Sequence, residues 1–247
     1  MLAPLAGKLV AVTGAGGGIG FAIASRFANE GASVVLLGRN KSKLQQALER
    51  IRSESGDKEK AKTHSIFPHD VRKLESWVHL AANYNGINIL VNSAGVTQTS
   101  LFVRTDPPTA EDILATNLHG AIWGCRVIGR DMIRRKDGGC IINVSSLLAL
   151  KSATGASVYA ASKAGLLGLT TSLAQEWGPY GIRVNAILPG YISTDMTKSL
   201  EKSPLIEKIP AQRFGTPDEV ADAAAFLAKN QYANNCMLNL DGGLSAT

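Results

Sequence analysis

Strand-length runs of apolar residues alternate with segments of helical periodicity along almost the whole of this chain. Strands that alternate with helices form right-handed βαβ units, which build a parallel sheet covered by helices on both faces. The nearly continuous apolar character of the strands agrees with burial on both sides. The sequence therefore predicts an α/β protein with a doubly wound parallel sheet of about seven strands. The expected strands are Leu9–Thr13, Val34–Leu37, Ser65–Phe67, Ile89–Asn92, Ile141–Val144, Arg183–Leu188 and Met237–Leu240, and the expected helices lie around 19–30, 41–54, 71–84, 110–136, 158–178 and 217–229.

The domain organisation is expected to be simple. No linker-like break divides the 247 residues, which predicts one domain over 1–247. The polar segment 53–62 is expected to be a solvated helix end or loop. The stretch 190–210 follows a strand end and is longer and less regular than the other connections, which predicts a lid over a substrate. In a sheet of this kind the ligand lies beyond the carboxyl ends of the strands.

Composition narrows the classes of function. Hydrophobic residues make up 45% of the chain and charged residues 19%, which is typical of a globular protein in water. No apolar run approaches the roughly 20 residues that span a bilayer. The first expected strand begins within a few residues of Met1, which leaves no room for a secretory signal or a full transit peptide. The net charge of +6 is not gathered in a long Lys/Arg run, so no nucleic-acid partner is expected.

Neither the cysteines nor the histidines are spaced for a metal. Cys125, Cys140 and Cys236 lie far apart, and the four histidines form no ligand pattern. We therefore expect no metal site, no disulfide framework and a reducing compartment.

A glycine-rich turn follows the first expected strand. It reads Thr13-Gly14-Ala15-Gly16-Gly17-Gly18-Ile19-Gly20 and leads directly into a helix. Glycines allow phosphate groups to approach the backbone closely, and a helix N-terminus offers free N–H groups. The spacing differs from the strict Gly-x-Gly-x-x-Gly fingerprint of dinucleotide sites. Its position between a buried strand and a helix nevertheless favours a nucleotide-binding turn over a loop without a ligand.

The residues after the second, third and fourth strands offer further contacts to a nucleotide. Arg39 stands where an NAD site usually has an acidic residue, and its cation suits a 2′-phosphate, although an ordinary surface arginine is the alternative. Asp70 is expected either to accept from an adenine amino group or to cap the next helix. Asn92, Ala94 and Gly95 belong to an Asn-Ser-Ala-Gly turn where the backbone passes close to the cofactor.

Ser146, Tyr159 and Lys163 form the candidate catalytic set. Tyr159 and Lys163 are four residues apart, so a helix places them on one face. A fixed ammonium favours the phenolate and thus adapts the phenol, with an ordinary pKa of about 10, to proton transfer near neutrality. Ser146 lies thirteen residues before Tyr159 and would orient a reacting carbonyl oxygen, whereas Ser145 ends the strand. Taken alone, the Tyr-x-x-x-Lys pair favours an exposed pair on a helix surface, and only its context in the chain favours the catalytic interpretation.

In chain order these motifs resemble the classical short-chain dehydrogenases/reductases over essentially the whole sequence. The resemblance implies a Rossmann-type subunit, an NAD(P)(H) cofactor and a homotetramer. It also implies that Asn117 anchors a water relay which resupplies protons through Lys163, and that Ile192 and Thr194 bind the nicotinamide carboxamide. The matching residues are Thr-Gly-x-x-x-Gly-Ile-Gly at 13–20, Asn-Ser-Ala-Gly at 92–95, Asn117, Ser146, Tyr159, Lys163, Pro189 and Gly190, the last two being placed beside the cofactor.

Within that family the chain is most similar to 3-oxoacyl-[acyl-carrier-protein] reductases, through 93–105, 192–197, 209–215 and 240–243. This likeness implies reduction of a 3-oxoacyl thioester by NADPH on acyl carrier protein, in fatty-acid synthesis. The implied compartment is the mitochondrial matrix, with the cytoplasm as the alternative. Many bacterial reductases of this type have a basic residue where this chain has Gly17, so binding of a 2′-phosphate would depend more on Arg39.

Alternatives remain at two points. The basic cluster Arg130, Arg134, Arg135 and Lys136 is either a docking surface for the acidic carrier protein or a solvated helix end that complements the helix dipole. The function is either thioester reduction or a broader oxidoreduction of small or steroid-like ketones, because the fold and catalytic residues serve many substrates. A non-catalytic nucleotide-binding subunit is a third and less favoured hypothesis.

Overall fold

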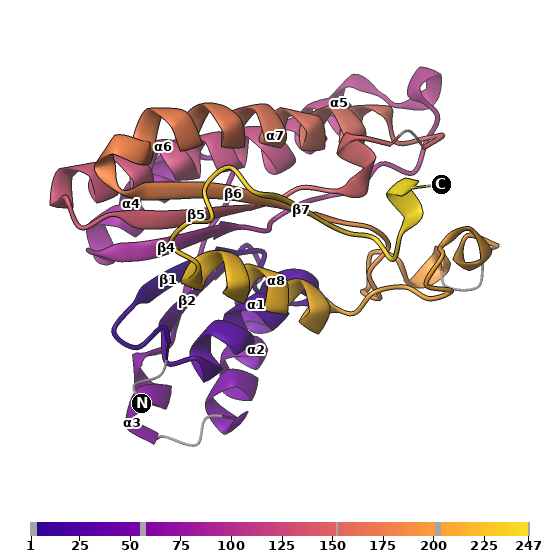
Figure 1. Cartoon of the computed structure of the whole chain (residues 1–247). Helices are drawn as coiled ribbons and strands as arrows, with labels where there is room; N and C mark the ends of the chain where they lie inside the picture. Colours follow the sequence, from indigo (N-terminus) through magenta and orange to yellow (C-terminus); the bar gives the residue numbers. More distant parts are fainter. Residues whose placement is uncertain (1–3, 55–57, 152, 201–203, 247) are drawn as a thin grey trace.

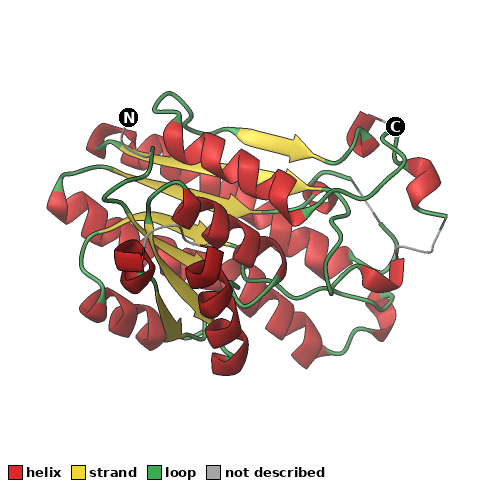
Figure 2. Cartoon of the chain, turned by 90° about the horizontal axis from the view of Figure 1, so that it is seen from below, coloured by secondary structure: helices red, strands yellow, loops and turns green. Residues whose placement is uncertain are grey.

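The computed structural model describes residues 4–54, 58–151, 153–200 and 204–246. Its centre is a parallel seven-stranded sheet in the order β3-β2-β1-β4-β5-β6-β7. The strand order reverses between β1 and β4, and a ligand crevice in such sheets lies beside that point. Figure 2 shows how successive strands rotate across the sheet. The strands are β1 (Leu9–Thr13), β2 (Ser33–Gly38), β3 (Ser65–Pro68), β4 (Ile87–Asn92), β5 (Gly139–Val144), β6 (Ile182–Pro189) and β7 (Met237–Leu240).

Helices cover both faces of the sheet, as the apolar strands require (Figure 1). On one face lie α1 (Gly18–Asn29), α2 (Lys41–Glu54) and α8 (Pro217–Lys229). On the other lie α4 (Leu74–Asn83), α5 (Pro107–Leu114), α6 (Gly120–Arg135) and α7 (Ser157–Trp177). Along β1, Val10 and Val12 belong to the first core and Ala11 to the second, so alternate side chains enter opposite layers. The predicted doubly wound fold is confirmed.

Shorter elements complete the connections. They are α3 (Lys58–Thr63), η1 (Phe102–Arg104), η3 (Leu147–Ala149), η4 (Gly178–Tyr180), η5 (Lys198–Leu200), η6 (Ile206–Lys208) and η7 (Leu244–Ala246). The polar segment 53–62 thus contains the end of α2 and most of α3, while 55–57 lie outside the described residues. Among the described helices, none is long and apolar enough to cross a membrane.

The expected single helix over 110–136 is wrong in one respect. A π-helical turn, η2 (Ala115–His119), separates α5 from α6. The side chain of Asn117 in this turn makes three hydrogen bonds to neighbouring segments, a tertiary requirement that periodicity does not reveal. Such π-turns often occur at functional sites. The helix expected over 71–84 begins only at Leu74, because Lys73 N–H donates to the Asp70 carbonyl oxygen in a preceding turn.

Candidate active site

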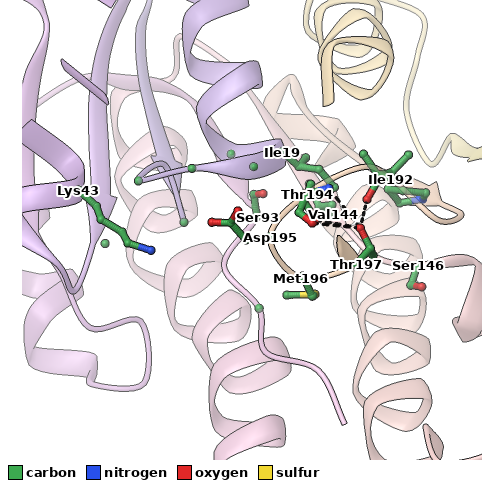
Figure 3. Close-up of a pocket in the computed structure, with 18 of the residues that line it drawn as sticks. Ile19, Lys43, Ser93, Val144, Ser146, Ile192, Thr194, Asp195, Met196 and Thr197 are labelled. Carbon is green, nitrogen blue, oxygen red and sulfur yellow. Dashed lines mark hydrogen bonds between the residues drawn. The ribbon is translucent and has the colours of Figure 1, made fainter. Parts of the chain in front are cut away.

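A cavity of about 480 Å³ opens at the carboxyl ends of the strands. Its wall combines the β1–α1 turn, the ends of β2, β5 and β6, the first turns of α7 and the segment after β6. Figure 3 shows Lys43 at one end and Ser146 at the other, so the cavity is elongated. The predicted site residues that line it are Gly14, Gly18, Ile19, Gly20, Arg39, Gly95, Ser146, Tyr159, Lys163, Pro189, Gly190, Ile192 and Thr194.

The glycine turn is shaped by close backbone approaches. Gly14 has φ +69°, and a Cβ there would lie 3.0 Å from the Ala94 Cα atom. A Cβ on Gly20 would lie only 2.6 Å from the Gly14 carbonyl oxygen. The first turn of α1 contains only uncharged residues, so its N–H groups and the positive end of the helix dipole face the cavity without an acidic neighbour. This cradle fits the pyrophosphate of a dinucleotide.

Thr13 holds this turn against the end of β4. Its hydroxyl accepts hydrogen bonds from the N–H groups of Ser93 at 2.9 Å and Ala94 at 3.0 Å, and donates to the Val91 carbonyl oxygen. Thr13 and Ala94 therefore support the cavity from behind, while Ser93 and Gly95 reach its wall.

Two cations lie at the far end of the cavity from Ser146. Arg39, at the end of β2, is exposed and lines the wall. Lys43, in the first turn of α2, lines it as well, although the sequence reasoning did not single it out. Its signal was the charge pattern: basic residues are unfavourable at a helix N-terminus, where acidic ones are preferred, unless an anion binds there. Arg39 and Lys43 together suit a phosphate.

Asn92 and Asp70, like Thr13 and Ala94, do not belong to the lining formed by the described residues. The Asn92 amide donates at 2.9 Å to the Asn143 side chain on β5, because the side chain faces the core. The Asp70 carboxylate binds the Arg72 guanidinium, which holds the pKa of that carboxyl below its usual range. Asp70 does not cap α4 either, since the N-cap residue is Lys73.

Ser146 and Tyr159 face each other across the cavity end. Ser146 follows β5, and its hydroxyl accepts from Leu148 N–H at 3.1 Å. Burial raises the pKa of Tyr159, and the nearby Ser146 hydroxyl opposes the rise. The neighbouring Ser145 hydroxyl donates to the Lys163 carbonyl oxygen at 2.8 Å, which ties α7 to β5. The structure thus separates the two serines as the spacing predicted, with Ser146 toward the phenol.

Lys163 lies one helical turn after Tyr159 and is buried, with 4% of its surface exposed. Its ammonium donates to the Val144 carbonyl oxygen at 2.8 Å and lies 5.8 Å from the centre of the Tyr159 ring. Burial lowers the pKa of Lys163 to about 8. A buried cation beside a phenol favours the phenolate, and its own proton is easily exchanged near neutral pH.

Asn117 stands behind this pair. Its side chain accepts from Val96 N–H at 2.8 Å, and donates to the Val96 carbonyl oxygen at 2.9 Å and to the Ser162 hydroxyl at 3.0 Å. A Cβ on Gly95 would lie 3.4 Å from both the Asn117 Oδ1 and the Lys163 Nζ atoms. Asn117 therefore joins the β4 turn to α7, and the expected water relay remains a prediction.

The segment after β6 contains a residue that the sequence did not reveal. The Thr197 hydroxyl accepts from Thr194 N–H at 3.1 Å and donates to the Ile192 carbonyl oxygen (Figure 3). It closes a turn that brings Thr194, Asp195 and Thr197 to the wall of the cavity. A hydroxyl residue in an irregular stretch gives no distinguishing signal in a single sequence.

Comparison with known proteins decides the family. The model of the short chain dehydrogenase family matches residues 8–204. The chain belongs to this family. It is 38% identical to the 3-oxoacyl-[acyl-carrier-protein] reductase FabG of Chlamydia muridarum (strain MoPn / Nigg), over 98% of both chains, and 39% identical to the human 3-oxoacyl-[acyl-carrier-protein] reductase, over 96% of this chain and 98% of that protein. A crystal structure from Agrobacterium tumefaciens, titled as a putative 2-deoxy-d-gluconate 3-dehydrogenase with bound NADP, aligns over 98% of each chain with a TM-score of 0.89 and 32% identity.

As a short-chain dehydrogenase, the chain is an oxidoreductase that acts on CH–OH and C=O groups and binds a nicotinamide cofactor. The cavity fits both ends of such a cofactor. The glycine cradle and the two cations would bind its phosphate-bearing end. The Ser146, Tyr159 and Lys163 set would lie at its nicotinamide end. No cluster of metal-ligating side chains occurs among the residues that the structure describes.

Acidic neighbours pair with part of the basic cluster near the end of α6. Arg134 binds Asp131 at 2.8 Å, and Arg135 binds Asp131 and Asp137 and donates to the Ile87 carbonyl oxygen. Because these residues precede β5, they lie at the amino-terminal edge of the sheet, opposite the cavity of the same subunit. Both observations favour the solvated helix end over a docking surface beside this cavity.

Proposed function

We propose that this short-chain dehydrogenase uses NADPH to reduce a 3-oxoacyl thioester on acyl carrier protein to the 3-hydroxyacyl form. The likeness to the chlamydial and human reductases over nearly the whole of each chain carries the substrate assignment. Arg39 and Lys43 support NADPH, because both cations lie where a phosphate on the adenosine ribose would be bound.

The chemistry needs a hydride and a proton. The reduced nicotinamide, when bound, supplies the hydride to the ketone carbon. Ser146 holds the ketone oxygen by a hydrogen bond, and Tyr159 transfers its phenolic proton to that oxygen as the hydroxyl forms. The Lys163 ammonium stabilises the resulting phenolate and binds the ribose hydroxyls of the cofactor. Asn117 then anchors the water molecules that return a proton through Lys163.

The cavity residues would divide the cofactor between them. Gly14, Gly18, Ile19 and Gly20 would bind the pyrophosphate, and Ile192 and Thr194 the carboxamide. The segment 190–210 would close over the substrate, with 201–203 outside the described residues.

We further propose that the protein is a homotetramer in the mitochondrial matrix, with the cytoplasm as the alternative compartment. Sedimentation equilibrium tests the oligomeric state, and imaging of the tagged protein tests the compartment.

Reduction of small hydroxylated ketones is the second candidate. It is favoured by the 0.89 TM-score to a structure titled as a putative sugar-acid dehydrogenase. Initial rates with NADPH on acetoacetyl-acyl carrier protein, acetoacetyl-coenzyme A and a panel of free ketones separate the two. Thioester turnover well above that of every free ketone is expected. Fast reduction of a free ketone without thioester turnover would replace the first proposal by the second.

A further inference from the structure

The catalytic helix α7 begins without a capping side chain of its own. Its first residue is Ser157, so Tyr159 lies within the first turn. The N-cap residue, Ala156, carries only a methyl group, which cannot accept a hydrogen bond. The first N–H groups of a helix need an acceptor, and a first turn without one frays. Fraying here would displace the phenol directly.

Gln98, on the loop after β4, supplies that acceptor. Its Oε1 atom accepts from Val158 N–H at 2.8 Å and from Tyr159 N–H at 3.2 Å. Its Nε2 atom donates to the Ser100 carbonyl oxygen at 3.0 Å and to the Thr105 hydroxyl at 2.9 Å. The residue is 7% exposed, and all the hydrogen-bonding capacity of its amide is used.

The orientation of this amide follows from its partners. A reversed amide would place its N–H groups against the two N–H donors of α7, so only one orientation satisfies the site. The hydrogen bonds therefore fix both the position and the orientation of the Gln98 amide. It is also neutral, and a neutral acceptor caps the helix without adding a negative charge at the first turn of α7, which contains Tyr159.

We propose that Gln98 is a positioning residue for catalysis: it fixes the first turn of α7, and with it the Tyr159 phenol, through an uncharged cap. This inference rests on the part of the proposed function that makes Tyr159 the proton donor, and it is independent of which ketone is reduced. Gln98 acts through Tyr159 and does not itself touch the reacting atoms.

Two substitutions separate its geometric role from its electrostatic role. Gln98→Leu removes the acceptor, and we expect kcat to fall roughly 10- to 100-fold, because small displacements of a catalytic group have effects of that size. NADPH affinity, measured by fluorescence titration, should stay within about twofold, since the Gln98 side chain makes no hydrogen bond to the glycine cradle or to Arg39 among the described residues. A kcat within twofold of the parent would overturn the proposal, as would equal losses of kcat and NADPH affinity.

Gln98→Glu keeps the acceptor and adds a negative charge. The titratable groups around the phenol are Lys163 and Tyr191, and a new carboxylate raises the pKa of each and of Tyr159 itself. The alkaline limb of the reduction pH profile should therefore move to higher pH by about half a unit or more. If Gln98→Leu does not fold, this variant decides alone, and an unmoved limb contradicts the inference.

Asp106→Ala is the matched control. Asp106 ends the same loop and caps α5 by accepting from Thr109 N–H at 2.7 Å. Its loss should lower the melting temperature but leave kcat and the pH profile unchanged. Tyr159→Phe is assayed beside these variants. If that protein keeps its activity, the proposed mechanism fails; if it is inactive while both Gln98 variants behave as the parent, only the inference about Gln98 fails.

Discussion

The ammonium of Lys163 lies 5.8 Å from the centre of the Tyr159 ring, on the same face of α7. Burial makes this arrangement dependent on pH, because it lowers the pKa of Lys163 to about 8. The cation that stabilises a phenolate is thus lost just above neutrality, whereas an exposed lysine would keep its charge to above pH 10.

For Lys163 we expect kcat/KM for ketone reduction to fall as the pH rises through about 8. Lys163→Arg should have low activity, because the longer, planar cation does not fit the same pocket, but its residual activity should persist to higher pH, since guanidinium does not titrate there. Rates measured between pH 6 and 10 test this. If kcat/KM falls at the same alkaline pH in the parent and in Lys163→Arg, the group that titrates there is not Lys163.

Arg39 and Lys43 are expected to set the preference for NADPH. Arg39→Ala and Lys43→Ala should each raise the KM for NADPH about tenfold, the size expected for a lost charge-assisted hydrogen bond, and change the KM for NADH by less than about twofold. Lys41→Ala is the control, since Lys41 lies on the same helix but outside the described cavity lining. Equal effects on both cofactors would contradict a phosphate site at these residues.

The sequence predicts what depends on local pattern and misses what depends on distant partners. The strands, the glycine turn and the Tyr159–Lys163 spacing are local features, and the structure places them as expected. Gln98 caps a helix that begins 59 residues later in the chain, since α7 starts at Ser157. The hydrophobic periodicity of the sequence does not indicate a contact between segments so far apart in the chain. Asn92 shows the same limit, because its motif predicts a backbone close to the cofactor and does not reveal that its side chain donates to Asn143 on β5.

His69 should limit stability in mild acid. It is buried, and its Nε2 atom has no hydrogen-bond partner among the described residues. Burial lowers its pKa to about 4, whereas the unfolded chain binds the proton near 6.5. Below pH 6.5 the unfolded state therefore holds more protons, and the free energy of unfolding falls as the pH drops toward 4, by at most about 3 kcal/mol.

His69→Leu removes this titration. The variant should be less stable at pH 7, because the Ser76 hydrogen bond at 2.7 Å is lost, but its stability should change less between pH 6.5 and 4. Urea unfolding at several pH values gives the comparison. His64 is also buried with a lowered pKa, so part of the acid dependence should remain. The same pH dependence in variant and parent would exclude His69 as the responsible group.

Gly20 tests how far the nucleotide cradle depends on backbone contact. Within a helix, alanine normally gains up to about 1 kcal/mol over glycine. At Gly20, however, the added Cβ would lie 2.6 Å from the Gly14 carbonyl oxygen, and overpacking of this kind costs about 1–3 kcal/mol. Gly20→Ala should therefore lower the free energy of unfolding of the cofactor-free protein and weaken NADPH binding, because the turn must move.

Gly17→Ala is the matched control for this prediction. Gly17 has an extended φ of 171°, and its Cβ would meet no atom of the described residues within 4 Å. The free energy of unfolding of Gly17→Ala should stay within about 0.5 kcal/mol of that of the parent, as for other substitutions without a steric conflict. If Gly20→Ala were as stable as Gly17→Ala and bound NADPH equally well, the close packing of α1 on the β1 turn would not be what shapes the cofactor cradle.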